Sequence, residues 1–179
     1  AGEIESWLND KIATSEVTIN TPPDVDLDTD GEMVVTDFTF QIRGVTVGLN
    51  FLRLTFDGTR EVAVAGELDV LGREPRFWCD LEVEYPAGGP LSVASVSNVK
   101  IADFEPDLSP GDLDAIAECL NSLIDKSGLS IDAPAGESLE GIDVVDSELV
   151  TTWTDATLYH TVAGIENELN DMADTLATK

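Results

Sequence analysis

The chain has 179 residues and a formal net charge of −27, with 36 acidic residues against nine basic ones. Because no run of Lys or Arg offers a cationic patch, this charge excludes nucleic-acid binding and disfavours contact with anionic membrane surfaces. The hydrophobic fraction of 42% is sufficient for a folded core, and the length favours one core over two.

Lysine is scarce, and the acidic residues are spread along the chain instead of being clustered. The lysines are Lys11, Lys100, Lys126 and Lys179. This composition indicates a solvated acidic surface, as in a halophilic or marine protein. The alternative is that some of the carboxylates bind a cation.

The N-terminal residues 2–13 are predicted to form a short amphipathic helix. Its apolar positions follow a 3.6-residue period and are Ile4, Trp7, Leu8 and Ile12. A strand is expected over residues 16–20, before the break at Pro22-Pro23.

Between Gly31 and Phe104 the sequence reads as successive strands with apolar and polar side chains in alternation. The phase of this alternation slips near Phe51, which predicts a β-bulge, and Asp57-Gly58 predicts a hairpin turn. The strand after Gly72 has an apolar face made of Phe77, Cys79, Leu81, Val83 and Tyr85. Such alternation means that one face is buried and the other meets water, so the sheet must curl around a core or be covered by helices.

A helix is predicted over residues 109–127. Ser109 is its N-cap, Pro110 occupies the first helical position, Asp112 completes a capping box, and Gly128 ends it. Its apolar stripe comprises Leu113, Ile116, Leu120, Leu123 and Ile124. Two short strands are expected afterwards, around residues 129–132 and 142–152.

The last segment, Asp155–Thr178, carries apolar residues at heptad spacing and predicts a helix over about 156–177. The seam is Leu158, Val162, Ile165, Leu169, Met172 and Leu176. This helix could pack in a groove of its own domain, or it could mediate self-association or docking onto a partner. We therefore expect an α+β domain over 1–153, with a curved, mainly antiparallel sheet packed on amphipathic helices, followed by this helix over 154–179.

Catalytic chemistry is sparse in the sequence. The one histidine, His160, is expected in the first turns of the last helix, and neither Cys79 nor Cys119 looks like an exposed, activated thiol. A glycine-rich phosphate loop and a CxxC motif are both absent. We therefore expect a protein that is not an enzyme and requires no cofactor. The two cysteines are compatible with two buried thiols or with one bridge.

One acidic stretch matches the ligand spacing of an EF-hand-type calcium loop. Its carboxylates are Asp26, Asp28, Asp30, Glu32 and Asp37. Alternate carboxylates around a glycine can converge on Ca²⁺, although Pro22-Pro23 before the loop and a strand after it are unlike an EF-hand. The alternative is a polar turn without metal.

The order of elements resembles that of the tubular lipid-binding superfamily, which includes bactericidal/permeability-increasing protein and the mite group 7 allergens. The resemblance covers about residues 1–153 and includes a cysteine on a strand, Cys79, and one on the long helix, Cys119. It implies a disulfide between these two cysteines and an apolar ligand held between the sheet and its helices. The implied lining comprises Phe38, Phe40, Leu49, Phe51, Leu81, Val83, Ile116, Leu120 and Leu123.

The expected function is therefore non-enzymatic binding or carriage of a lipid or another apolar ligand. Two alternatives remain open: a structural or assembly subunit that oligomerises through the last helix, and a calcium-stabilised extracellular binding module. We expect a soluble protein without a transmembrane segment, located outside the cell, in the periplasm or at the cell surface.

Overall fold

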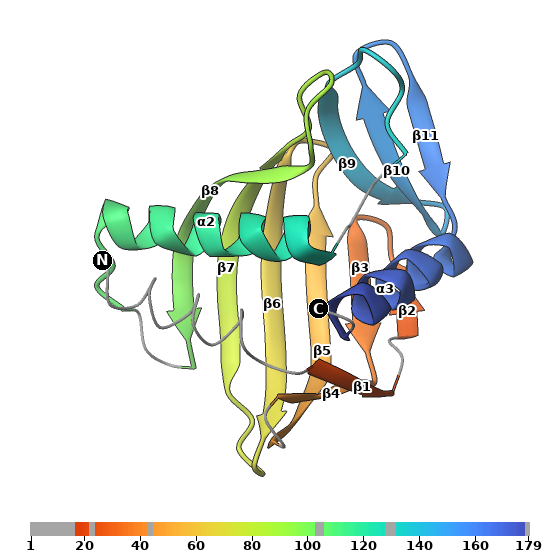
Figure 1. Ribbon diagram of the computed structural model, residues 1–179. Helices are drawn as coiled ribbons and strands as arrows, with labels where there is room; N and C mark the ends of the chain where they lie inside the picture. The colour runs from red at the N-terminus through yellow and green to blue at the C-terminus, as the bar shows by residue number, and fades with distance from the viewer. Residues whose placement is uncertain (1–16, 22–23, 43–44, 103–105, 128–131, 178–179) are drawn as a thin grey trace.

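A computed structural model of the protein describes residues 17–21, 24–42, 45–102, 106–127 and 132–177 (Figure 1). The expected helix over 2–13 and nearly all of the expected strand over 129–132 lie outside these residues. The strands of a large sheet are β1 (Val17–Thr21), β2 (Asp24–Asp26), β3 (Glu32–Thr36), β4 (Phe38–Ile42), β5 (Val45–Phe56), β6 (Glu61–Val70), β7 (Arg76–Glu84) and β8 (Ser92–Ile101). The remaining elements are α2 (Pro110–Ser127), β9 (Leu139–Val145), β10 (Glu148–Trp153), β11 (Thr157–His160) and α3 (Val162–Ala177).

The large sheet has eight antiparallel strands and confirms the predicted α+β class. Its main order is β1-β4-β5-β6-β7-β8, and the β2–β3 hairpin joins it because β3 also pairs with β5. Strand β5 is long enough to pair with β4 along Val45–Leu49 and with β3 along Leu52–Thr55. Asp37, with φ of 59°, separates β3 from β4.

The two predicted irregularities of the meander are present. The pairing of β5 with β6 shifts register between Leu49 and Phe51, as expected for a bulge at this point. Gly58, with φ of 82°, turns the chain between these strands, and Asp57 Oδ1 accepts a hydrogen bond from the Thr59 amide at 3.0 Å. Together they set which side chains of β5 face the core.

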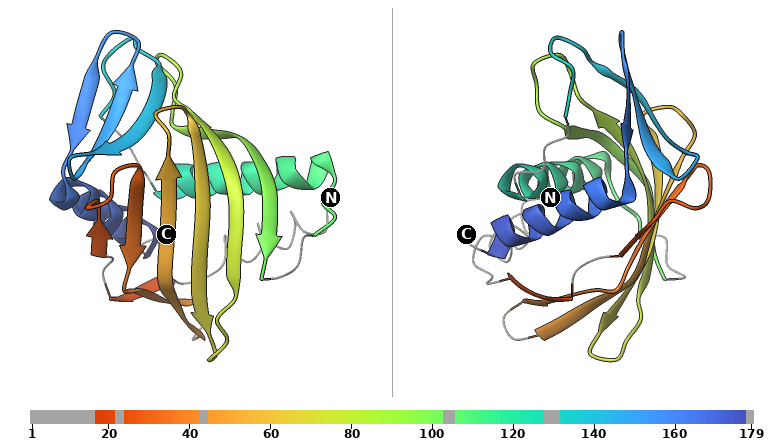
Figure 2. Two further views of the ribbon diagram at one scale, coloured as in Figure 1. Left: turned by 180° about the vertical axis from the view of Figure 1, so that it is seen from behind. Right: turned by 90° about the vertical axis from the view of Figure 1, so that its right-hand side faces the viewer.

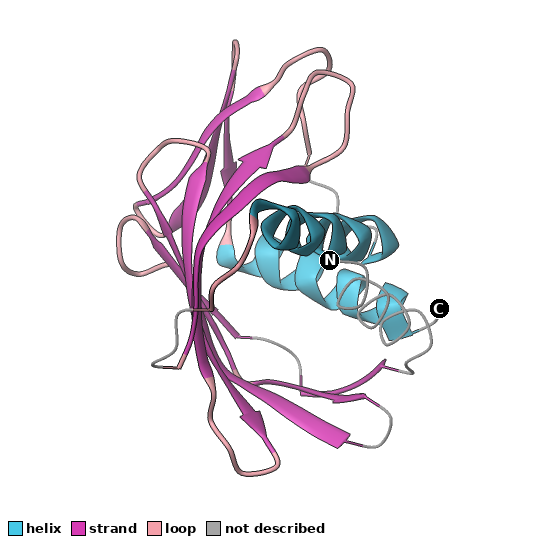
Figure 3. Ribbon diagram, turned by 90° about the vertical axis from the view of Figure 1, so that its left-hand side faces the viewer, coloured by secondary structure: helices cyan, strands magenta, loops and turns pink. Residues whose placement is uncertain are grey.

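Both helices lie on the concave side of the curved sheet (Figures 2 and 3). Helix α2 runs across the sheet and packs on β8, whereas α3 packs near β1 and β2 (Figure 1). The start of α2 is capped reciprocally: the Ser109 amide donates to Asp112 Oδ2 at 2.9 Å, and the Asp112 amide donates to Ser109 Oγ at 3.3 Å. The helix predicted over 109–127 is therefore confirmed.

A separate three-stranded sheet in the order β11-β10-β9 closes one end of the interior (Figure 1). It joins the large sheet through backbone hydrogen bonds from Gly31 N to Val144 O at 2.8 Å and from Ile142 N to Thr59 O at 2.9 Å. The strand expected over 142–152 is in fact two strands, because Asp146 and Ser147 turn the chain with φ of 52° and 63°. Two consecutive positive φ values are typical of a tight hairpin turn.

The prediction of a helix over 156–177 is wrong at its N-terminal end, because residues 157–160 form β11. This strand pairs with β10, with Leu149 opposite His160 and Thr152 opposite Thr157. Helix α3 starts after Thr161, whose Oγ1 accepts a hydrogen bond from the Gly164 amide at 3.2 Å as an N-cap. Sheet pairing and this cap thus override the heptad spacing, and the expected domain boundary after residue 153 falls inside a sheet.

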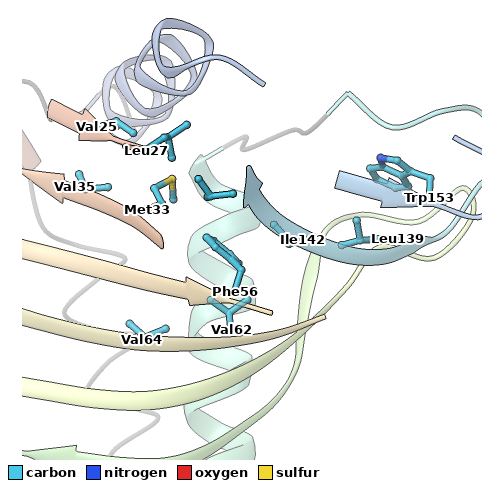
Figure 4. Close-up of a cluster of buried hydrophobic side chains, with 11 residues drawn as sticks. Val25, Leu27, Met33, Val35, Phe56, Val62, Val64, Leu139, Ile142 and Trp153 are labelled. Carbon is cyan, nitrogen blue, oxygen red and sulfur yellow. The ribbon is translucent and has the colours of Figure 1, made fainter. Parts of the chain in front are cut away.

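The main hydrophobic core lies between the large sheet, the three-stranded sheet and α3 (Figure 4). Trp153, Leu27 and Val144 are its largest fully buried side chains. The Trp153 indole packs edge-on against Tyr85 at a centroid distance of 5.2 Å, and its Nε1 donates to Thr151 Oγ1 at 2.9 Å. The polar atom of this buried tryptophan is therefore satisfied inside the core.

Substitution Gly141→Ala tests the junction between the two sheets. A Cβ at this position would overlap the Gly58 carbonyl oxygen. Because the overlapped atom belongs to the backbone, it cannot move aside as a flexible side chain would. We expect the free energy of unfolding, measured by urea denaturation, to fall by about 1–3 kcal/mol. The control is Gly111→Ala in α2, where a Cβ would make only an ordinary contact at 3.8 Å; this variant should be neutral or more stable. Equal stability of the two variants would contradict the described junction.

Candidate functional site

Besides its fully buried core residues, the concave face of the large sheet carries apolar side chains that are only partly buried. On the sheet these are Leu49, Leu52, Leu54, Phe77, Cys79, Leu81 and Val83. From the helices, Ile116, Leu120 and Ile124 of α2 and Ile165 and Leu169 of α3 face the same interior. The sheet and both helices therefore enclose one apolar region.

Two buried clusters meet in this interior. The larger one contains Phe56, Val62 and Val64 beneath the three-stranded sheet (Figure 4). The smaller one contains Val93, Val96 and Ala117, where α2 lies on β8. Cys79 and Leu81 of β7 pack against both clusters. The interior is therefore continuous from α3 to α2.

Helix α2 is attached to β8 by a polar contact as well as by its apolar stripe. Asn121 Oδ1 accepts a hydrogen bond from the Val93 amide at 2.6 Å, and Asn121 Nδ2 donates to the Val93 carbonyl at 3.0 Å. The oxygen and the nitrogen of the Asn121 side-chain amide therefore both hydrogen-bond to the backbone of one residue of the sheet. This pairing fixes the position of α2 along β8 and with it the position of Leu120.

Helix α3 packs against its own domain. Glu166 Oε1 accepts a hydrogen bond from the Val25 amide at 3.2 Å, which ties the helix to β2. The heptad residues Leu158, Val162, Ile165 and Leu169 pack against the main core. Of the two expectations for this segment, the structure shows packing within the chain.

The structure brings together most of the predicted lining residues. Leu49, Leu81 and Val83 pack against the main core, and Ile116 and Leu120 pack against the smaller cluster. Phe38 is half-buried and lies opposite Leu49 in the β4–β5 pairing. The side chains of Phe40 and Leu123 lie outside the described residues.

Phe51 does not line the interior with the others. The bulge between Leu49 and Phe51 places Phe51 on the same face of β5 as Arg53, whose guanidinium lies 6.0 Å from the ring centroid. Leu52 and Leu54 take the inward positions instead. The bulge was predicted from the sequence, but its consequence for Phe51 was not.

The expected disulfide between Cys79 and Cys119 is wrong, since these two described cysteines form no disulfide. Cys79 points into the interior from β7, whereas the side of α2 that faces the sheet is defined by Ile116, Leu120 and Ile124 at i, i+4 and i+8. Cys119 lies about 100° around the helix from Leu120 and so is not directed at β7. Burial raises the pKa of the Cys79 thiol, and Asp80 adds to this effect, which disfavours a reactive thiolate.

The carboxylates of the predicted calcium loop have separate contacts. Asp26 Oδ1 accepts from the Asp28 amide at 2.7 Å, Asp30 Oδ1 accepts from the Asp146 amide at 3.2 Å, and Glu32 forms an ion pair with Arg53 at 3.7 Å. Asp37 follows the far end of β3. Within the described ranges, no three His, Cys, Asp or Glu side chains are grouped to hold a metal ion. Calcium binding by this loop stays a prediction.

The outer face of the large sheet carries a groove that sequence reasoning missed. It consists of two adjoining cavities of about 570 and 470 Å³, which share Thr55, Ala63, Asp80 and Asn98. Trp78, Ala65 and Lys100 line the first cavity, and Asp57, Glu61 and Glu82 line the second. The available signal was Trp78, an aromatic residue at an outward position of a strand whose other outward residues are polar.

Comparison with known proteins identifies no relative: no family model, no curated protein and no solved structure matches the chain. The resemblance to the tubular lipid-binding superfamily therefore stays an expectation. In the part of the chain that the structure describes, neither helix is sufficiently long and apolar to cross a membrane.

His160 allows a test of the contacts in the three-stranded sheet. It lies in β11, not in a helix, and its Nε2 is 3.1 Å from Thr151 Oγ1, which also accepts from Trp153. Burial lowers the pKa of His160 below its ordinary value of 6.5, although Asp132 opposes the shift. The unfolded chain therefore binds the proton more tightly, so the free energy of unfolding should decrease as the pH falls below 6.5.

Urea denaturation between pH 7.5 and pH 5.5 measures this dependence. His160 is the one histidine of the chain, so the variant His160→Gln should remove most of the decrease in this interval. A decrease of the same size in the variant would show that other groups cause it. An increase in stability of the wild-type protein at lower pH would contradict the direction of the pKa shift.

Proposed function

We propose that the protein is a non-catalytic binding protein that holds a neutral, apolar ligand between the concave face of the large sheet and helices α2 and α3. The observation that carries this proposal is the incomplete burial of the side chains that face this covered interior. Leu81, Val83 and Leu120 are inward-facing, yet each is only partly buried. A protein core is normally filled to high density, whereas a ligand site leaves apolar side chains for the ligand to cover.

The charge of the protein supports a neutral ligand. The described lining includes aliphatic and aromatic side chains and one thiol. The described cationic side chains on strands of the large sheet, which are Arg53, Arg76 and Lys100, are paired with outward-facing residues and lie on the other face. The net charge of −27 would in addition repel an anionic ligand. A long-chain alcohol, a sterol or a hydrocarbon-like metabolite has the matching chemistry.

The chemistry of the described residues supports binding and not catalysis. The Cys79 thiol has a raised pKa, which lowers its fraction of thiolate. His160 has a lowered pKa, and the contact that the structure gives its Nε2 is the hydroxyl of buried Thr151. Neither group therefore has the partners of an activated nucleophile or a general base.

The rival functions have less support. Self-association through the last helix was based on a heptad seam, and Val162, Ile165 and Leu169 of this seam pack against the chain's own core. A calcium-stabilised module has less support because, within the described residues, no three His, Cys, Asp or Glu side chains are grouped to hold a metal ion.

Titration with N-phenyl-1-naphthylamine, a neutral apolar fluorophore, tests the proposed interior site. The wild-type protein should raise its fluorescence in a saturable manner with a one-to-one stoichiometry. Leu120→Trp adds bulk to the interior from α2 and should weaken binding by at least tenfold, because the added side chain occupies ligand space. Leu120→Met is the matched control with nearly the same volume, and it should bind within about threefold of the wild type.

Circular dichroism and urea denaturation establish that both variants are folded before they are compared. Non-saturable fluorescence of the wild-type protein would contradict the proposal. Equal affinity of Leu120→Trp and the wild type would place the fluorophore elsewhere and would also contradict it.

A further inference from the structure

The groove on the outer face of the large sheet, which we call the outer groove, is formed by cross-strand neighbours. Ala65 lies opposite Trp78, and Trp78 lies opposite Lys100. In the next row of paired residues, Ala63 lies opposite Asp80. Thr55 of β5 lies opposite Ala63 and extends this second row. The outer groove therefore crosses four neighbouring strands on the face opposite the apolar interior.

Trp78 is the centre of this groove. This residue is 37% exposed, although tryptophan is highly buried on average. The neighbouring positions on β6 are Ala63 and Ala65, which are too small to cover an indole ring. The result is an aromatic platform with an open cavity of about 570 Å³ beside it, within the size range of ligand sites.

Hydrogen-bond donors and acceptors both lie next to the indole of Trp78. Asp80 Oδ2 accepts a hydrogen bond from Asn98 Nδ2 at 2.5 Å, so these two side chains orient each other at the edge of the cavity. Asn98 has φ of 52° and lies within the register shift of the β7–β8 pairing, between Ser97 and Lys100, where a bulge redirects side chains. Asp80 retains acceptor capacity, and Lys100 lies opposite Trp78 on β8.

We propose that the outer groove binds a neutral saccharide chain. A sugar ring has an apolar face of C–H groups that can stack on an indole, and its hydroxyl groups both donate and accept hydrogen bonds. The outer groove offers these features together: the indole of Trp78, the carboxylate of Asp80 and the amide of Asn98. The second cavity continues the groove past Asp80 towards Ser95 and Ser97, which favours several linked sugar units over a single one.

Charge argues against the other ligand classes. An anionic ligand would meet Asp57, Glu61 and Glu82 along the second cavity. A cationic ligand at Trp78 would lie beside Lys100, its neighbour on β8. The carboxylates nearest to it are already engaged, because Asp80 accepts a hydrogen bond from Asn98 and Glu82 forms an ion pair with Arg60. A neutral, hydroxyl-rich molecule avoids both repulsions. This site lies on the other face of the sheet from the proposed apolar interior and does not depend on it.

Affinity electrophoresis in native gels that contain dextran, xylan, laminarin or galactomannan tests the inference. Wild-type protein should be retarded by at least one of these neutral polysaccharides. Trp78→Ala and Asn98→Ala should each lower the affinity at least tenfold, because they remove the platform and one polar group. Tyr159→Ala, which removes an aromatic side chain that is 66% exposed outside the groove, should be retarded like the wild type.

Each substituted residue is at the surface, and circular dichroism verifies the fold of every variant. Trp78→Ala should also bind N-phenyl-1-naphthylamine like the wild type, so failure of one proposed site is distinguishable from failure of the other. The inference is overturned if none of the four polysaccharides retards the wild-type protein, or if Trp78→Ala is retarded as strongly as the wild type.

Discussion

The arrangement of this protein depends on covering one apolar face of a curved antiparallel sheet. In β6 the residues Val62 and Val64 are buried while Ala63 is exposed, and in β7 apolar and polar residues continue to alternate along the strand. Exposure of that whole face to water would cost about 25 cal/mol for each Å² of apolar surface, so it must be covered. Helix α2 covers it from the β8 side, α3 covers it near β2, and the three-stranded sheet closes one end (Figures 1 and 3).

This constraint separates two chemistries on the two faces of one sheet. The concave face is apolar, and its partly buried side chains form the proposed ligand site. The outer face is polar and carries most of the acidic residues of β6 and β7, interrupted by Trp78 and its alanine neighbours. Because side chains of adjacent residues point to opposite faces, Cys79 and Leu81 belong to one site, whereas Trp78 and Asp80 belong to the other. A single strand, β7, thereby contributes to both.

Local signals in the sequence predicted much of the fold. The alternation gave the strands of the meander, Ser109 and Asp112 gave the start of α2, and Asp57-Gly58 gave a hairpin. The errors at the last helix have one long-range and one local cause. Residues 157–160 become a strand because β10 offers them a partner, and a capping Thr161 starts the helix later than its heptad spacing suggested. The lining was an expectation from the resemblance, and the bulge places Phe51 on the opposite face of β5 from Leu52 and Leu54. The outer groove arises from neighbours on four strands that no single segment reveals.

The most direct test of the apolar interior is paramagnetic broadening of methyl signals in NMR spectra, with a neutral spin-labelled long-chain alcohol as the ligand. A spin label broadens the signals of its nearest methyl groups most strongly. If the interior holds the alkyl chain, the methyl signals of Leu81, Leu120 and Leu169 should lose intensity at equimolar ligand, while those of Ala94, Ala135 and Ala163, which are exposed, should be affected much less. Uniform, weak broadening of all methyl signals, or selective loss at the exposed alanines, would contradict an apolar site between the sheet and its helices.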